Sequence, residues 1–313
     1  MYKILFVGVG SIATRHIINL SQVLKEKGIE YRIDVLRSGQ GKTLRQDVTE
    51  IVYKQFSIGD TIPFDYDIAF ITNPTAMHFN SINQYVNNTQ HMFIEKPIFD
   101  NIDYDIKKLN LKDNSIYYVA CPLRYSSVLQ YVKKNIDCSQ AIAVRSLSSS
   151  YLPDWRPETD YRRTYSAHRD LGGGVSIDLI HEWDYLTWLF GMPDKVESVI
   201  GKYSSLEIDS DDSALYIGKN ENMTFELHLD YYGRKTLRSL QIFLPDETID
   251  IDLINSKICY LKQEKDVDFI GNRDAFQRKE LKHFLDIIEG KCKNDNDIYH
   301  ALDVLKLSRG ISG

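Results

Sequence analysis

Short apolar runs alternate with helical segments through the first part of the chain. The runs are rich in Ile, Val, Leu, Phe and Tyr, as buried strands are, and they cover residues 3–7, 32–36, 68–71, 91–94 and 117–120. Helices are predicted between them at 11–27 and 75–87. This alternation is typical of a parallel sheet built from βαβ units, so we expect a doubly wound α/β domain over residues 1–120.

Beyond residue 120 the pattern changes to strands separated only by turns. The predicted strands are 141–147, 195–203, 213–218, 223–230 and 239–244. Helical patterns precede most of these strands at 175–189 and follow them at 274–289 and 297–308. Consecutive strands favour antiparallel pairing, so we predict a second α/β domain with a mainly antiparallel sheet over residues 121–313.

Composition narrows the class of protein. The 313 residues are 43% hydrophobic and 26% charged, with a formal net charge of −6, which is typical of a folded two-domain protein and argues against a nucleic-acid partner. No apolar stretch reaches about 18 residues, and the N-terminus enters a strand without a signal-peptide pattern, so we expect a cytoplasmic protein without a membrane partner. Four scattered cysteines exclude a zinc ribbon and are expected to be reduced and structural.

A glycine pattern, G-x-G-x-x-A, follows the first strand and opens the first helix. Gly8 permits the tight turn, Gly10 lets backbone approach a pyrophosphate, and Ala13 lets the helix pack closely on the strand. The helix N-terminus, with Ser11 and Ile12, attracts the phosphate charge. These residues predict a dinucleotide-binding site.

The end of the second strand bears on the choice of cofactor. An acid there binds the ribose 2′-hydroxyl of NAD, whereas a cation suits the 2′-phosphate of NADP. The strand is followed by Arg37 and Ser38, with Lys42 and Arg45 just beyond. Because a guanidinium beside a hydroxyl suits a phosphomonoester, we predict NADP(H) in preference to NAD(H). The alternatives are that Asp34 reaches a ribose or that Arg37 is a solvated strand end.

Two further polar turns follow strands, at the carboxyl edge where such sheets bind ligands. Asn73 and Pro74, with His78 nearby, form the first and are predicted to contact the cofactor, although they also suit an ordinary strand-to-helix turn. Glu95 and Lys96 form the second and are likewise predicted to contact the cofactor. Lys96 is predicted to supply positive charge or a proton to a reacting hydroxyl, the alternative being a solvated surface lysine.

The segment 172–184 begins with three glycines, which leave a loop able to approach a ligand, and continues as a helix. On one helix Asp178 and His181 share a face, and Asp184 lies at its edge. A carboxylate beside an imidazole raises its basicity, so His181 is a candidate base that takes a hydroxyl proton, with Asp178 as its partner. A second functional hypothesis is a metal site, but a single His is weak support for zinc. The structural alternative is that the Asp caps the helix and the His packs in the core.

Taken together, the glycine pattern at 8–13, the Asn73-Pro74 turn, the Glu95–Pro97 element and the 172–184 segment resemble the glucose–fructose oxidoreductase / inositol dehydrogenase (Gfo/Idh/MocA) family of NAD(P)-dependent oxidoreductases. The resemblance covers essentially the whole chain. It implies a Rossmann domain followed by an α/β domain whose large open sheet binds substrate and often forms an oligomer interface, so we expect a homodimer or homotetramer.

The resemblance also implies roles for single residues. Lys96 resembles the catalytic lysine, and Asp178 and His181 resemble the Asp/His pair of the family. Many members place the Asp four residues before the His, whereas the gap is three here, so Asp184 is an alternative partner of His181. No metal is implied.

Substrate contacts are implied in the same way. Arg124 and Tyr125 resemble an element that lines the cleft, and Trp155, Arg156 and Tyr161 lie in a segment that resembles the substrate loop of a branch acting on sugars or nucleotide sugars in cell-surface polysaccharide pathways. We therefore expect hydride transfer between nicotinamide and a carbinol or carbonyl carbon. The alternatives are a nicotinamide-sensing regulatory protein on the same scaffold and a reductase of a non-sugar carbonyl.

Overall fold

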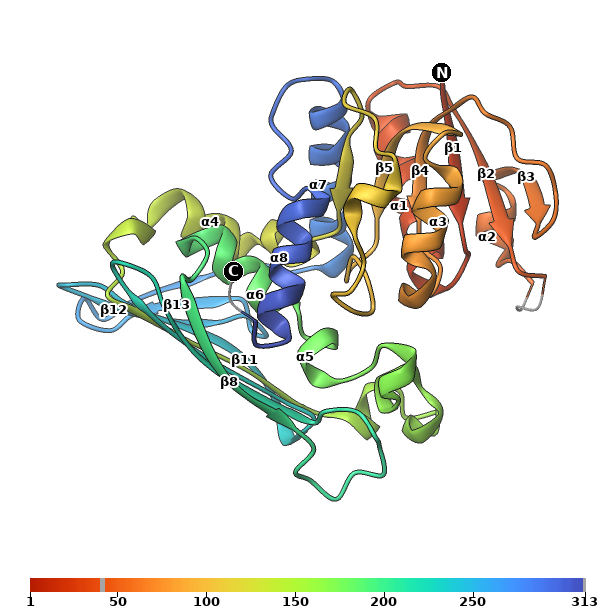
Figure 1. The fold of residues 1–313 in the computed structure, drawn as a ribbon. Coiled ribbons are helices and arrows are strands. Elements are labelled where there is room, and N and C mark those ends of the chain that lie inside the picture. The colour runs from red at the N-terminus through yellow and green to blue at the C-terminus, as the bar shows by residue number, and fades with distance from the viewer. Residues whose placement is uncertain (40–42, 312–313) are drawn as a thin grey trace. The chain divides into compact units, whose positions relative to one another are not determined.

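The computed structural model describes residues 1–39 and 43–311, which form two compact units (Figure 1). The first unit comprises Met1–Pro122 and Asp274–Leu302, and the second comprises Leu123–Arg273 and Asp303–Gly313. This division departs from the predicted domains, because residues 274–302 return to the first unit instead of remaining in the second. Within the described part of the chain, no helix is long and apolar enough to cross a membrane.

The first unit contains a six-stranded sheet in the order β3-β2-β1-β4-β5-β6, in which every pair is parallel. Its elements are β1 (Tyr2–Val7), α1 (Ser11–Glu26), β2 (Tyr31–Arg37), α2 (Gln46–Thr49), β3 (Val52–Ser57), β4 (Tyr66–Ile71), α3 (His78–Tyr85), β5 (Thr89–Ile94), β6 (Tyr117–Val119) and α7 (Arg273–Ile288), and α8 (Ile298–Ser308) begins in it. The central strands are buried on both faces, as a parallel sheet covered by helices requires.

The second unit contains an eight-stranded sheet in the order β14-β13-β12-β11-β7-β10-β9-β8. All its pairs are antiparallel except β7 with β10. Its strands are β7 (Ala143–Tyr151), β8 (Lys195–Gly201), β9 (Ser213–Lys219), β10 (Thr224–Asp230), β11 (Tyr232–Phe243), β12 (Thr248–Asp252), β13 (Lys257–Tyr260) and β14 (Lys265–Asp268), and its helices are α4 (Ser127–Asn135), α5 (Val175–Asp178) and α6 (His181–Phe190). The predicted fold class is confirmed.

One face of the second sheet is covered and the other is open. Trp183 of α6 packs edge-on against Tyr216 of β9, with ring centroids 5.3 Å apart. The neighbours of Tyr216 on the strand point the other way, and Leu215 and Ile217 are 40% and 68% exposed. Alternation of this kind is typical of an antiparallel sheet with one solvated face. The homodimer or homotetramer stays a prediction.

The secondary structure differs from the sequence prediction in several places. Strand β3 was not predicted, because it is an edge strand in which only Phe56 is buried and no apolar run marks it. The short strands β12–β14 and helix α4 were also missed. The helix predicted at 175–189 is wrong as a single element, since the chain leaves helical geometry at Leu179 (φ −97°, ψ 26°), between α5 and α6.

Candidate functional site

The loop between β1 and α1 has one tightly packed and one open glycine. Gly8 has a φ of +87°, and a Cβ there would lie 2.6 Å from the Cα of Asn73, so a larger residue does not fit. Gly10 is the N-cap of α1 without a side-chain cap, and a Cβ there would meet nothing within 4 Å. Open space thus lies beside the uncapped helix N-terminus at Ser11, and this arrangement fits the pyrophosphate of a dinucleotide.

The turn after β4 is bonded to this glycine loop. The Thr72 hydroxyl donates to the carbonyl oxygen of Gly8 at 2.7 Å, and the Asn73 amide donates to Ser81 Oγ at 2.7 Å. Pro74 is exposed and precedes the short 3-10 helix Thr75–Met77. Asn73 and Pro74 therefore lie at the carboxyl end of β4 beside Gly8. Their direct contact with a cofactor stays a prediction.

His78 lies beneath this turn, 1% exposed. Its Nε2 lies 3.0 Å from the carbonyl oxygen of Asn73, and its Nδ1 lies 3.1 Å from those of Pro97 and Ile98. Burial lowers the pKa of the ring, since it penalises the charged form. The prediction that His78 touches the cofactor is at odds with this burial, and the structure gives the ring a role in holding two turns.

Glu95 and Lys96 follow the carboxyl end of β5. One carboxylate oxygen of Glu95 lies 2.5 Å from Nε2 of His16 on α1, and the other accepts the backbone N–H of Lys96 at 3.2 Å. Burial opposes ionisation of Glu95, but the hydrogen bond and charge of His16, with the charges of Lys96 and His78, outweigh it and lower the pKa. Glu95 thus fixes the backbone at Lys96, and its own contact with a cofactor stays a prediction.

The carboxyl end of β2 is Arg37, followed by Ser38, as the sequence analysis requires. Lys42 lies outside the described residues. Arg45 is exposed and forms an ion pair with Asp47. Arg37, at the carboxyl end of β2, stays the residue predicted to contact a 2′-phosphate.

Asp34 is buried within β2 at 1% exposure. Its carboxylate accepts two hydrogen bonds from the Arg32 guanidinium, at 3.1 and 2.9 Å, and one from the Tyr66 hydroxyl at 2.8 Å. Both oxygens are therefore committed within the protein. The alternative in which Asp34 reaches a ribose is wrong for this structure.

In the second unit, Asp178 ends α5 and His181 begins α6, with the helix break between them. The hydroxyls of Tyr165 and Tyr231 donate to the two oxygens of Asp178, each at 2.6 Å. Burial and the Asp178 charge raise the pKa of both tyrosines, which keeps these donors protonated. His181 is half-buried. The structure therefore provides a carboxylate held by two phenols three residues before the candidate base.

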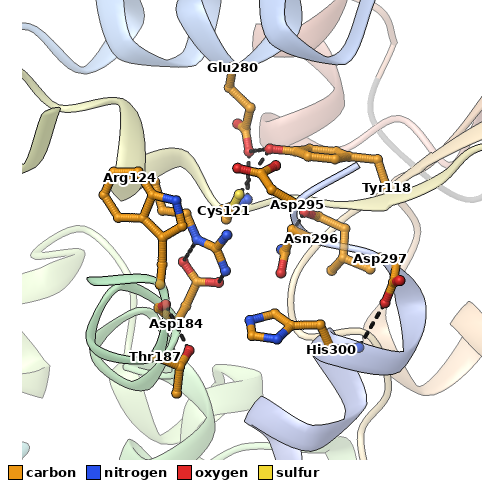
Figure 2. Close-up of polar contacts among 12 residues, drawn as sticks. Tyr118, Cys121, Arg124, Asp184, Thr187, Glu280, Asp295, Asn296, Asp297 and His300 are labelled. Carbon is orange, nitrogen blue, oxygen red and sulfur yellow. Dashed lines mark hydrogen bonds and ion pairs between the residues drawn. The ribbon is translucent and has the colours of Figure 1, made fainter. Parts of the chain in front are cut away.

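Asp184 and Arg124 form a buried, two-pronged ion pair (Figure 2). Arg124 Nε and Nη2 donate to the carboxylate at 3.0 and 2.7 Å, and the Arg124 residue is 1% exposed. Asp184 thus bonds to Arg124, and its pairing with His181 stays the predicted alternative to Asp178. The guanidinium of Arg124, a residue implied to line the substrate cleft, bonds to a carboxylate of its own unit, and its contact with a substrate stays a prediction.

The glycines at 173 and 174 are explained by packing within the protein. A Cβ on Gly173 would lie 2.1 Å from the carbonyl oxygen of Tyr165. Gly174 has a φ of +126°, and a Cβ there would lie 2.3 Å from Oδ1 of Asp211. The expectation that this loop leaves room for a ligand is therefore wrong for these two positions.

The predicted substrate segment folds into short 3-10 helices, Leu152–Trp155 and Tyr161–Arg163. Trp155 is 38% exposed, and its ring stands edge-on to Tyr231 at 5.3 Å. Arg156 is exposed, the Tyr161 hydroxyl accepts the backbone N–H of Glu207, and Tyr125 is buried. Trp155 thus joins the tyrosine pair around Asp178, while substrate contacts of all these residues stay predictions.

Two residues of the site were missed in the sequence. Tyr231 lies 53 positions from Asp178, and His16 lies 79 positions from Glu95. Neither distance leaves a local spacing that sequence reasoning detects. Within residues 1–39 and 43–311, no group of three or more His, Cys, Asp or Glu side chains is placed to hold a metal ion.

Comparison with known proteins agrees with this architecture. Residues 2–110 match the family model described as "Oxidoreductase family, NAD-binding Rossmann fold", and residues 146–238 match the model of its "C-terminal alpha/beta domain". The chain therefore belongs to the Gfo/Idh/MocA oxidoreductase family, and the resemblance drawn from its motifs is confirmed.

Individual relatives are distant. The uncharacterized oxidoreductase YrbE of Bacillus subtilis (strain 168) is 24% identical over 206 residues, which are 64% of this chain and only 56% of that protein. Levoglucosan dehydrogenase in complex with NADH has a TM-score of 0.83 at 13% identity, covering 99% of this chain and 95% of its own.

Two solved structures of nucleotide-sugar dehydrogenases are also similar. UDP-N-acetylglucosamine 3-dehydrogenase of Acidithiobacillus ferrooxidans has a TM-score of 0.74 at 16% identity, covering 99% of this chain and 96% of its own. WlbA dehydrogenase of Bordetella pertussis, in complex with NADH and UDP-GlcNAcA, has a TM-score of 0.77 at 15% identity, covering 99% and 95%. Identities this low show a shared fold.

Proposed function

We propose that this protein transfers a hydride between the nicotinamide of NADP(H) and a carbinol or carbonyl carbon of a sugar or nucleotide sugar. Membership of the oxidoreductase family supports the reaction class. The observation that carries the proposal is the Asp178 carboxylate, held by two tyrosine hydroxyls and followed three residues later by His181. Such a carboxylate is suited to orient an imidazole that exchanges a proton with a hydroxyl.

The roles of the residues follow from their chemistry. A bound nicotinamide supplies or accepts the hydride. In the oxidising direction His181 takes the hydroxyl proton, and Asp178, held in place by its two phenol donors, stabilises the imidazolium that results. The Lys96 ammonium stabilises the negative charge that develops on the oxygen. In the reducing direction the same steps run backwards, and His181 protonates the oxygen of the carbonyl group as its carbon accepts the hydride.

Replacing His181 with Asn tests this assignment. We expect kcat to fall by about 10²- to 10⁴-fold, because a general base is lost while the polar surface is kept. The measurement is the change in cofactor fluorescence with a panel of free and nucleotide-linked sugars. His228→Asn, on β10 of the same unit, is the matched control and should retain wild-type turnover.

Undiminished turnover in His181→Asn would remove His181 from the mechanism. A wild-type protein that binds the cofactor tightly but turns over no sugar would favour the sensor hypothesis. Turnover of a non-sugar carbonyl compound alone would favour the hypothesis of a non-sugar carbonyl reductase, in which the same residues act on a different substrate.

Arg37 is proposed to bind the 2′-phosphate of NADP(H). Replacing it with Ala should weaken NADPH binding by about 10- to 100-fold, the loss expected for one charge-assisted hydrogen bond, and leave NADH binding nearly unchanged. Fluorescence titration of wild type and variant with both cofactors measures this. Arg45→Ala is the control, because Arg45 is already paired with Asp47. Equal affinity of the wild type for both cofactors would contradict the preference.

A further inference from the structure

Two buried histidines contact the segment that carries Lys96, one at each end. His16, from α1, reaches the side chain of Glu95 immediately before Lys96. His78, from α3, reaches the carbonyl oxygens of Pro97 and Ile98 immediately after it. The two rings are 0% and 1% exposed. Neither ring is therefore placed to touch a substrate in solvent.

The contacts of His16 fix which of its ring nitrogens is a donor. Nε2 faces a carboxylate oxygen of Glu95, so it carries a proton and donates. Nδ1 is buried and has no hydrogen-bond partner among the described residues. The ring packs edge-on against Phe93 of β5, with centroids 5.1 Å apart. One polar contact, to Glu95, thus accounts for a polar side chain in an otherwise aromatic environment.

Glu95 contacts both His16 and the backbone of Lys96. Its second oxygen accepts the backbone N–H of Lys96, so the carboxylate joins helix α1 to the main chain at that residue. Helix α1 is also the helix whose uncapped N-terminus lies beside Gly10. The two parts of the first unit that the proposed function uses, the phosphate-binding helix and the lysine, are therefore joined through one buried side-chain pair.

His78 completes the arrangement on the other side. Its Nε2 faces the carbonyl oxygen of Asn73, whose turn is bonded to Gly8 through Thr72. The ring thus lies between the Asn73 turn and the chain after Lys96. Because burial disfavours the charged ring, one of the two nitrogens donates a hydrogen bond and the other only packs against its carbonyl oxygen, so the ring bonds to one loop and contacts the other.

We propose that His16 and His78 are positioning residues that fix the backbone of Lys96 relative to helix α1 and the Asn73 turn. The inference rests on the proposed role of Lys96 and goes beyond it by assigning the groups that set its place. A displacement of a catalytic group by about 1 Å can cost about 10²-fold in rate, so loss of either contact should act on kcat more than on binding.

The test compares His16→Leu, which keeps the bulk and removes the donor, with His16→Gln, whose amide can again donate to Glu95. We expect His16→Leu to lower kcat by about 10²-fold with the NADPH dissociation constant within about threefold of wild type, and His16→Gln to recover most of the loss. His91→Leu is the matched control. His91 lies on β5, the strand that leads to Lys96, but within the described residues its ring accepts the N–H of Ile116 and forms no hydrogen bond with Glu95 or Lys96. The kcat of this variant per folded molecule should equal that of wild type.

A second variant keeps the test decisive if His16→Leu does not fold. Glu95→Met keeps most of the length of the side chain but removes both carboxylate oxygens, so neither the bond to His16 nor the bond to Lys96 survives. It should show the same fall in kcat. A kcat within threefold of wild type in His16→Leu or, where that variant is unfolded, in Glu95→Met would overturn the proposal, as would a His16→Gln that is as slow as His16→Leu.

A separate readout distinguishes failure of this inference from failure of the proposed function. If the wild type turns over no sugar, the rate of acetylation of Lys96 by limiting acetic anhydride is measured against that of Lys134 by mass spectrometry. A change of at least about threefold in His16→Leu, reversed in His16→Gln, supports positioning of Lys96, because its reactivity follows its environment. An unchanged relative rate overturns it.

Discussion

Replacing Lys96 with Met should lower kcat for the sugar by about 10²- to 10³-fold, the loss measured when one group that stabilises developing charge is removed. Met keeps most of the length of the side chain and removes its charge. Because the glycine loop is unaltered, the dissociation constant of the cofactor should stay within about threefold of wild type. Steady-state kinetics and fluorescence titration separate these two effects.

Lys96→Arg distinguishes the two roles predicted for the lysine, charge stabilisation and proton transfer. Arginine keeps the positive charge but does not release a proton at neutral pH. Substantial turnover in Lys96→Arg, against little in Lys96→Met, identifies charge stabilisation as the role. Loss of turnover in both is expected if Lys96 transfers a proton. Full turnover in Lys96→Met would remove this residue from the mechanism.

The second large effect concerns stability. Replacing Asp184 with Ala leaves the Arg124 guanidinium buried at 1% exposure without its carboxylate partner. Breaking a buried ion pair by removing one partner costs about 3 to 5 kcal/mol, so the free energy of unfolding should fall by that amount. Urea denaturation followed by circular dichroism and by tryptophan fluorescence measures the change, the second probe reporting on Trp183 and Trp188 of α6.

An exposed pair in the same unit is the control. Arg145 and Glu226 bond across β7 and β10 at 2.8 Å, with their side chains 56% and 51% exposed. Glu226→Ala should change the free energy of unfolding by less than about 1 kcal/mol, because water replaces the lost partner. Equal effects of Asp184→Ala and Glu226→Ala would show that burial does not set the strength of the first pair.

Local patterns predicted the parts of this protein that depend on local chemistry. The strand–glycine–helix order at 2–26 is fixed by neighbouring residues, and Gly8 is required by its positive φ. The same reasoning failed for β3, because an edge strand with a single buried residue has no apolar run. A parallel sheet makes its central strands easy to recognise and its edges difficult.

The site was predicted less completely, since its contacts join distant parts of the sequence. Spacing placed Asp178 and His181 on one helix, but the helix is interrupted at Leu179. The Asp178 carboxylate is instead held by Tyr165 and Tyr231, which are distant in the sequence or on another element. The sequence likewise shows that Arg124 carries a positive charge, but not which anionic group it pairs with. Only the folded chain shows that this anion is Asp184.

The return of residues 274–302 to the first unit affects how the chain is made. Phe284 of α7 packs against Phe93 and Tyr118, and the Glu280 carboxylate accepts the backbone N–H of Cys121 (Figure 2). A nascent chain that ends near residue 120 lacks these groups and exposes the apolar surface that they cover. The N-terminal unit therefore completes its core only once residues 274–302 have been synthesised, which happens after the second sheet has been made.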